Sequence, residues 1–306
     1  MNKVYINVDK SAKYQYFLLT FDDAFVLVGG GICKSILKNT DEKVCFIVFT
    51  ENLNEDSLNK LKAYNIPFII YFVSGDKIKY DASKYFWPRV SVIRLIAPFI
   101  IEEEMDYLYY LDCDFLCINK LDDLFKLHIK TSVAICPELI GNIIQRCEDY
   151  PTDNLYCNSG FIIFNISKYK ENYTEDKIIS AFNDMVDNLR FPDQDFLNVY
   201  FKDDATYLNP IKYNLQLRVY VGSNNKFIKA HLLDNTVLLH FTTREKPWKN
   251  NCWLVIAKTY RKYNVDLEMD ALVKKAMCWH RVLYIPRLIK RILRKIYRIV
   301  FKGNRK

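Results

Sequence analysis

The sequence predicts an α/β fold with a mainly parallel, Rossmann-like sheet flanked by helices. Short apolar runs alternate with amphipathic segments through the first hundred residues, in the order strand, helix, strand, helix. Several apolar runs end in polar or acidic residues, as strands do where an open sheet binds its ligands. Half of the 306 residues are apolar and 15% are aromatic, so the chain can build a large core.

The chain opens with a polar, lysine-containing lead-in, residues 1–15, which either adds an edge strand or stays mobile. Residues 16–21 (YFLLTF) are apolar and aromatic, and they predict a buried strand that ends at Asp22 and Asp23. Residues 29–39 predict a helix with three glycines near its start. The glycines do not form GxGxxG, so we interpret them as points of close contact between helix and sheet and not as a dinucleotide site.

Two further pairs of strand and helix follow in the same order. Their strands are continuous apolar runs, and their helices are amphipathic. The second helix contains Arg94 and is expected to end at Pro98. This order implies a mainly parallel sheet with right-handed crossovers. The expected strands are residues 44–50 and 68–73, and the expected helices are residues 54–64 and 90–99.

The next strand ends in a pair of carboxylates. Residues 107–111 have the length and aromatic content of a buried strand, and Asp112 and Asp114 follow it closely. Side chains two positions apart on an extended segment point the same way, so both carboxylates can approach one divalent ion. Their hard oxygen donors suit Mg²⁺ or Mn²⁺. An Asp-x-Asp also occurs in ordinary acidic turns, so the motif alone does not establish a metal site.

The second half of the chain repeats the pattern of strands and helices with polar ends. Residues 132–136, 156–165 and 237–241 predict strands, and residues 175–189 and 191–201 predict helices. Acids in the first turn of the second helix also suit its dipole, so part of that cluster can be a helix cap. The polar residues at these element ends are Asn158, Ser159, Gly160, Asp193, Gln194, Asp195 and His240.

The cysteine pattern and the length of the apolar runs indicate in which cellular compartment the protein is expected. Nine cysteines, an odd number, fall largely inside apolar runs without CxxC spacing, which favours free core thiols in a reducing cytoplasm. The N-terminus lacks the apolar core of a signal peptide, and no run of about 18 apolar residues occurs. We therefore expect neither secretion nor a spanning helix.

Basic charge is concentrated at the end of the chain. Residues 281–306 hold ten Lys or Arg and no acid, whereas the preceding residues carry 34 basic and 36 acidic side chains. Pro286 can start a helix whose apolar and basic side chains lie on opposite arcs. Such a basic amphipathic helix lies on an anionic membrane surface. Docking on the enzyme itself and binding to nucleic acid are the alternatives, and the continuous apolar arc favours lipid over both.

Five separated segments carry the polar ends of these strands and helices. They are LLTFDDAFVLVGGGICKSIL, YYLDCDFLCINKLDDLF, YCNSGFIIFNI, FPDQDFLN and LLHFTTREKPWK. Together they resemble glycosyltransferase family 8, the retaining GT-A enzymes that include bacterial lipopolysaccharide galactosyl- and glucosyltransferases and glycogenin. The resemblance implies a GT-A catalytic domain over residues 16–280, between an N-terminal extension at 1–15 and the basic tail at 281–306.

The resemblance implies a metal centre. Asp112, Asp114 and His240 would be the protein ligands of Mn²⁺ (or Mg²⁺), and the ammonium of Lys246 would neutralise the leaving diphosphate of a sugar nucleotide. A lone histidine is more often structural than a ligand. The position of His240 at a strand end, six residues before a lysine in a KPW loop, favours the ligand.

The same resemblance implies a donor site for a UDP-sugar. Asp22 would accept a hydrogen bond from the uracil ring, and Thr20 would contact the base through its backbone. Arg94 would reach the donor sugar and diphosphate, with a surface ion pair as the alternative. Gln194 would stand near the β face of the anomeric carbon, with Asp193 beside it, as the catalytic pair. The implied substrate-binding set is Thr20, Asp22, Asp23, Arg94, Asp112, Cys113, Asn158, Asp193, Gln194, His240, Thr243 and Lys246.

Two residues depart from the family pattern. Ala24 stands where the family often has Asn, which removes a polar contact near the nucleoside. Thr243 stands where it usually has Gly, which puts a β-branched side chain where the backbone approaches phosphate closely. Both changes are expected to lower donor affinity or rearrange the loop.

We expect a Mn²⁺-dependent retaining enzyme that moves galactose or glucose from a UDP-sugar to a saccharide acceptor, either an oligosaccharide or a bacterial surface glycolipid, at the inner face of the cytoplasmic membrane. One alternative is a haloacid-dehalogenase-like phosphatase, which also uses Asp-x-Asp after an apolar strand. That class carries the motif near the N-terminus, with Thr or Val where Leu116 stands here. A sugar-nucleotide-binding protein without turnover is the other alternative, which Thr243 leaves open.

Overall fold

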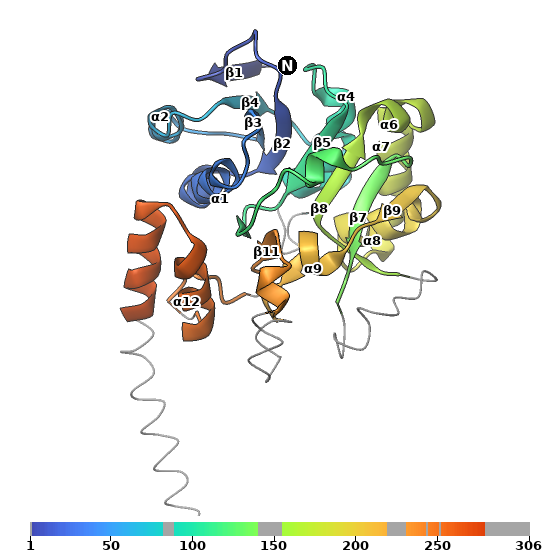
Figure 1. Ribbon diagram of the computed structural model, residues 1–306. Coiled ribbons are helices and arrows are strands. Elements are labelled where there is room, and N and C mark those ends of the chain that lie inside the picture. The colour runs from blue at the N-terminus through green and yellow to red at the C-terminus, as the bar shows by residue number, and fades with distance from the viewer. Residues whose placement is uncertain are drawn as a thin grey trace, which may run out of the picture.

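The centre of the protein is an eight-stranded sheet in the order β1-β4-β3-β2-β5-β8-β7-β9 (Figure 1). The computed structural model describes residues 2–81, 89–139, 155–218, 231–242, 244–250 and 252–278. Six strands run in one direction, and β1 and β8 run against them. The strands are β1 (Asn2–Ile6), β2 (Gln15–Thr20), β3 (Val44–Thr50), β4 (Phe68–Phe72), β5 (Tyr107–Leu111), β7 (Val133–Pro137), β8 (Cys157–Asn165) and β9 (Ala205–Tyr207).

Helices cover both faces of this sheet, which explains why its central strands are buried at nearly every position. One core joins the sheet to α1, α2 and α12, and a second core joins the opposite face to α3, α4, α6, α7 and α8. The helices are α1 (Val26–Lys38), α2 (Glu55–Ala63), α3 (Val90–Ile93), α4 (Ala97–Ile100), α6 (Ile166–Asn172), α7 (Glu175–Met185), α8 (Pro192–Tyr200), α9 (Pro210–Tyr213) and α12 (Leu254–Tyr263), and residues 267–278 are also helical.

A second, three-stranded sheet extends the strand that carries the paired carboxylates. It consists of β10 (Leu215–Gln216), β11 (Leu238–His240) and β6 (Phe115–Cys117), in the order β10-β11-β6. Three residues, 112–114, separate the end of β5 from the start of β6. Asp112 and Asp114 therefore lie at the junction of the two sheets.

Most of the expected elements are present, and the lead-in at residues 1–15 contributes the edge strand β1. The prediction that Pro98 ends its helix was wrong. Residues 90–100 form α3, the 3₁₀ helix η2 (Arg94–Ile96) and α4, and Pro98 lies in the first turn of α4. The first turn of a helix tolerates proline because its N–H groups have no partner within the helix.

The glycines of α1 are close-contact points, but most of their partners belong to helices and not to the sheet as expected. A Cβ on Gly30 would lie 2.4 Å from the ring of Tyr64 at the end of α2, whereas one on Gly29 would lie 2.7 Å from the ring of Phe21, directly after β2. The eight cysteines in the described ranges are all free thiols, and seven of them are buried. Within the same ranges, no helix has both the length and the apolar character needed to cross a bilayer.

Candidate active site

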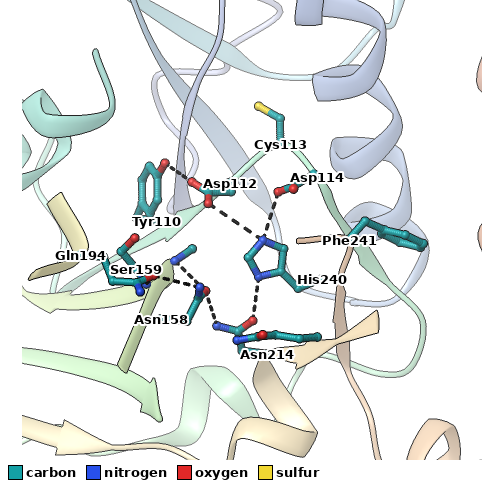
Figure 2. Close-up of polar contacts among 12 residues, drawn as sticks. Tyr110, Asp112, Cys113, Asp114, Asn158, Ser159, Gln194, Asn214, His240 and Phe241 are labelled. Carbon is teal, nitrogen blue, oxygen red and sulfur yellow. Dashed lines mark hydrogen bonds and ion pairs between the residues drawn. The ribbon is translucent and has the colours of Figure 1, made fainter. Parts of the chain in front are cut away.

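Three side chains from two sheets converge at the carboxyl end of β5 (Figure 2). The N–H of Asp112 donates to the carbonyl of Gly160 on β8 (2.9 Å), and the N–H of Phe241 donates to the carbonyl of Asp114 (2.9 Å). These backbone bonds hold the Asp-x-Asp segment between β8 and the end of β11. The carboxylates of Asp112 and Asp114 and the imidazole of His240 offer ligand atoms that all lie within 4.8 Å of one another.

This donor set fits a hard divalent cation. Two carboxylate oxygens and one imidazole nitrogen match the ligands that Mg²⁺ or Mn²⁺ accepts. Octahedral coordination at about 2.1 Å places ligand atoms about 3 to 4.2 Å apart. The distances from His240 Nε2 to Asp114 Oδ1 (3.1 Å) and to Asp112 Oδ2 (4.0 Å) fall in this range. Three protein ligands leave positions for substrate oxygens. Cys113 lies between the two aspartates, but its thiol faces the carbonyl of Thr20, and burial raises the thiol pKa, so sulfur is not part of the donor set.

His240 is held on every side. Its ring stacks on Phe115, with ring centroids 3.9 Å apart, and the residue is 2% exposed. Its Nε2 lies 3.1 Å from Asp114 Oδ1 and 4.0 Å from Asp112 Oδ2. Its Nδ1 lies 2.8 Å from the side-chain oxygen of Asn214. Nε2 is therefore the nitrogen that faces the carboxylates.

Gly160 makes this convergence possible. A Cβ at this position would lie 2.4 Å from His240 Cε1, 2.9 Å from Asp112 Oδ2 and 3.0 Å from Asn158 Oδ1. Only glycine lets β8 approach the side chains of this candidate metal site so closely. The conformation is not the reason, since this is an ordinary strand position.

Arg94 lies beneath the site and is 3% exposed, so the alternative of a surface ion pair is wrong. Its guanidinium donates to Asp112 Oδ1 (2.9 Å) and to Asp193, and it stacks over the ring of Tyr110 at 4.4 Å. Burial lowers the pKa of Arg94, but Asp193, Tyr110 and Asp112 outweigh burial and raise it, so the group stays charged. Tyr110 also donates to Asp112 Oδ1 (2.5 Å). One buried cation thus orients one proposed metal ligand and one residue of the catalytic pair.

The two residues expected to be the catalytic pair, Asp193 and Gln194, occupy the first turn of α8. Asp193 is 5% exposed and accepts hydrogen bonds from Arg94 and from the Ser159 hydroxyl (2.8 Å). Gln194 Oε1 accepts from Asn158 Nδ2 (3.1 Å) and from the Ser159 N–H (3.2 Å). Both side chains are therefore bound to the start of β8.

Helix capping was the alternative role predicted for the acids in the first turn of α8, and Asp195 has this role. Its Oδ2 accepts the backbone N–H groups of Arg190 and Phe191, each at 2.8 Å. Its Oδ1 accepts from the hydroxyl of Tyr156 (2.5 Å), which in turn accepts from Gln194 Nε2 (3.0 Å). Asp195 thus fixes the turn, whereas Asp193 faces Arg94.

Lys246 approaches the metal-binding carboxylates from the loop after β11. Its ammonium pairs with Asp114 Oδ2 and donates to the carbonyl of Phe241 (2.6 Å). Burial raises the pKa of Asp114, but Lys246 and His240 outweigh burial and hold it well below its usual range. Asp114 is therefore ionised at neutral pH, as a cation ligand must be.

The residues expected around the nucleoside lie at the end of β2. Thr20 Oγ1 is 3.4 Å from the hydroxyl of Tyr110, which places it beside Asp112. Asp22 and Asp23 are exposed. Asp22 caps the 3₁₀ helix η1 (Asp23–Phe25) by accepting the N–H of Ala24 (3.0 Å), and Asp23 accepts the N–H of Asn54 (3.0 Å). Thr243 lies outside the described residues.

The sequence did not predict the role of Asn214, which follows α9 and precedes β10. It is 2% exposed and bonds both His240 and Asn158. Tyr110 was predicted only as a strand residue, and Gly160 only as part of a polar strand start. The sequence indicated a role for Tyr110 only through its position, two residues before Asp112, where side chains of an extended segment point the same way.

The fold and the site together define a glycosyltransferase of the GT-A type. The chain belongs to glycosyl transferase family 8, whose sequence model matches residues 17–252, and it is a hexosyltransferase. The family match covers the Asp-x-Asp motif, and nothing in the comparisons supports the phosphatase alternative.

Relatives in bacteria include two enzymes of lipopolysaccharide assembly. The lipopolysaccharide 1,2-glucosyltransferase of Escherichia coli is 25% identical over 291 residues, which cover 88% of this chain and 86% of that protein. The lipopolysaccharide 1,3-galactosyltransferase of Salmonella typhimurium is 24% identical over 236 residues, which cover 72% of this chain and 68% of that protein. The galactosyltransferase LgtC, solved with donor and acceptor sugar analogues, shares the fold, with a TM-score of 0.63, 19% identity and coverage of 84% of this chain and 100% of that chain.

Proposed function

We propose that the protein is a retaining glycosyltransferase that moves galactose or glucose from a UDP-sugar to a saccharide acceptor of a bacterial surface glycolipid. The observation that carries the proposal is the open cluster of Asp112, Asp114 and His240, with Lys246 at its edge. The lipopolysaccharide glucosyl- and galactosyltransferases among its relatives support the acceptor class.

The cluster suits the departure of a nucleoside diphosphate. Mn²⁺ or Mg²⁺ at Asp112, Asp114 and His240 would supply positive charge for the diphosphate oxygens as the glycosidic bond breaks. Lys246 adds a second cation at the same place. A preorganised cation costs no reorganisation at the moment of reaction, which is why such groups stabilise the transition state.

Asp193 and Gln194 would act at the sugar ring. Asp193 is ion-paired with Arg94. We propose that Asp193 holds Arg94 in the orientation in which it binds the donor. Gln194 is partly exposed, and its carbonyl oxygen is held by Asn158 Nδ2 and the Ser159 N–H. An amide is a poor nucleophile, so we favour attack by the acceptor on the same face from which the diphosphate leaves, through an oxocarbenium-like state that Gln194 stabilises.

The membrane part of the proposal rests on the sequence alone. We propose residues 16–280 as the catalytic domain, residues 1–15 as its extension, and residues 281–306 as a peripheral anchor on the inner face of the cytoplasmic membrane. The tail lies outside the described residues. An acceptor embedded in that membrane gives the enzyme a reason to bind an anionic surface.

Donor binding is tested by thermal unfolding with nucleotides. With Mn²⁺ present, UDP should raise the unfolding temperature, since a ligand at 100 times its Kd stabilises by about 2.7 kcal/mol. GDP and CMP should not. Asn at position 22 can still cap η1 through its oxygen, but its NH₂ group would face the uracil N–H in place of a carboxylate oxygen.

Asp22→Asn should therefore keep the unfolding temperature of the free protein and lose most of the protection by UDP. Asp123→Asn, which changes an exposed carboxylate away from the site, should keep that protection. Equal protection by GDP would refute the role of Asp22.

A further inference from the structure

Asn214 lies directly behind His240 and links it to β8 (Figure 2). We propose that Asn214 is a positioning residue that keeps a proton on His240 Nδ1 and so presents Nε2, without a proton, to the cation. The proposal rests on the role of His240 as a metal ligand. It concerns a residue that has no part in the motifs of the active site.

The atoms of the hydrogen-bond network can be assigned because backbone groups anchor it. A backbone N–H can only donate. The N–H of Gly160 lies 3.0 Å from one side-chain atom of Asn158, and the N–H of Ser159 lies 3.2 Å from one side-chain atom of Gln194. Both of those atoms must therefore be oxygens. Asn158 Nδ2 is then the atom that donates to Gln194 Oε1 at 3.1 Å.

The assignment extends from Asn158 to His240. The same Asn158 oxygen lies 3.0 Å from Asn214, so the atom of Asn214 that faces it must be the NH₂ group. The oxygen of Asn214 consequently faces His240 Nδ1 at 2.8 Å. An amide oxygen can only accept, so Nδ1 carries the proton. Amide flips and histidine tautomers are usually a matter of choice, but here two backbone donors decide them.

Burial makes the other arrangements costly. Asn214 and His240 are each 2% exposed, and Asn158 is 9% exposed, so water does not replace a lost partner. Flipping Asn214 would set two oxygens against each other 3.0 Å apart. Removing the proton from Nδ1 would set its lone pair against an oxygen at 2.8 Å. Either change leaves buried acceptors without a donor. On the other side of the ring, Nε2 faces the carboxylate of Asp114 at 3.1 Å, which competes for a proton until a cation occupies the site.

The Nδ1 proton can be measured directly on protein labelled with ¹⁵N-histidine and loaded with Mg²⁺, which is diamagnetic and keeps the carboxylate of Asp114 from competing for the proton. Two-bond ¹H–¹⁵N correlations at a pH above histidine titration distinguish a proton on Nδ1 from one on Nε2. The chain has only four histidines, so His240→Gln assigns the signal. We expect the Nδ1–H form in the wild type and a shift towards Nε2–H in Asn214→Leu. An Nε2–H form in the wild type would overturn the proposal.

Mn²⁺ binding gives the second readout. Asn214→Leu should weaken Mn²⁺ affinity by about 10- to 100-fold, as loss of a residue that orients a metal ligand does. The control is Asn235→Leu, which removes an asparagine that contacts His231 at the surface and should not change the affinity. Unchanged affinity in Asn214→Leu would also overturn the proposal.

The two readouts separate this proposal from the proposed function. A wild type that binds neither Mg²⁺ nor Mn²⁺ would refute the metal role on which the proposed function rests, whereas a wild type that binds the ion and keeps a proton on Nε2 would refute only the role of Asn214. If Asn214→Leu does not fold, the wild type still decides the tautomer.

Discussion

Gly160 is the residue at which the site has least room. An added methyl group would meet the ring of His240 at 2.4 Å and the carboxylate of Asp112 at 2.9 Å. His240 cannot retreat, because Phe115 stacks on its ring and Asn214 holds its Nδ1. The absence of a side chain at position 160 therefore determines how closely His240 and Asp112, two of the proposed metal ligands, can approach each other.

Gly160→Ala should lower hexosyl transfer by about 10²-fold, the scale expected when catalytic groups move by about 1 Å. Gly31→Ala is the control. Its added Cβ would lie 3.1 Å from the flexible side chain of Met269, away from the site, and alanine favours the helix that contains it. Steady-state kinetics of both variants check this, and full activity in Gly160→Ala would show that the crowding has no catalytic importance.

Some residues of the site can be read from the sequence and others cannot. Asp112 and Asp114 follow an apolar strand at a spacing that points both side chains the same way. Asn214 lies between a one-turn helix and a two-residue strand, where no periodicity exists to interpret. Its importance comes from long-range contacts with His240 and Asn158, which only the fold creates.

At the scale of elements, Asp204 connects the start of the edge strand β9 to the segment before β7 and to the end of α6. It ends the 3₁₀ helix η5 (Lys202–Asp204), just before β9. Its carboxylate accepts from the Ser132 N–H (2.9 Å), from Asn172 Nδ2 (3.1 Å) and from the Tyr173 hydroxyl (3.0 Å). Burial raises the pKa of Asp204, but the bonds from Ser132, Asn172 and Tyr173 outweigh burial and lower it.

Asp204→Asn should reduce the free energy of unfolding by about 1 kcal/mol at neutral pH, a modest value because solvent screens this partly exposed group. A carboxyl group whose pKa is lower in the folded state stabilises above its unfolded pKa, and this contribution is lost as the pH falls through the folded value. The difference from wild type should therefore shrink below about pH 4.

Urea unfolding at several pH values measures this difference. Asp203→Asn, which changes the neighbouring exposed carboxylate, is the control and should have little effect. A difference between wild type and Asp204→Asn that stays constant from pH 7 to pH 3 would contradict the assignment.

The long apolar strands could be predicted from composition, and the short ones could not. All seven residues of β3 are buried, so its sequence is apolar throughout. By contrast, β6 has three residues and β10 has two, and each is a strand because β11 pairs with it. The reversed direction of β8 was not predicted either, because composition does not encode the direction of a buried strand.

At the scale of the whole molecule, charge is divided between a near-neutral body and the basic segment at residues 281–306. Deleting this segment should leave an enzyme that still uses short soluble acceptors. The full-length protein should sediment with anionic vesicles at low salt, and less so at high salt, because salt screens the attraction.

The truncated protein should stay in the supernatant, and vesicles of neutral lipid provide the control. If full-length and truncated proteins sediment alike with anionic vesicles at low salt, the segment is not the anchor.

The central claim is that a divalent cation at Asp112, Asp114 and His240 activates a UDP-sugar. The most direct measurement is the hydrolysis of UDP-galactose and UDP-glucose by the wild type, Asp112→Asn and Asp114→Asn, with Mn²⁺ and with EDTA. We predict turnover of at least one donor by the wild type in Mn²⁺, its loss in EDTA, and a decrease of about 10²-fold or more in each variant. Equal turnover in Mn²⁺ and EDTA, or no turnover of any UDP-sugar despite binding of UDP, would contradict the claim.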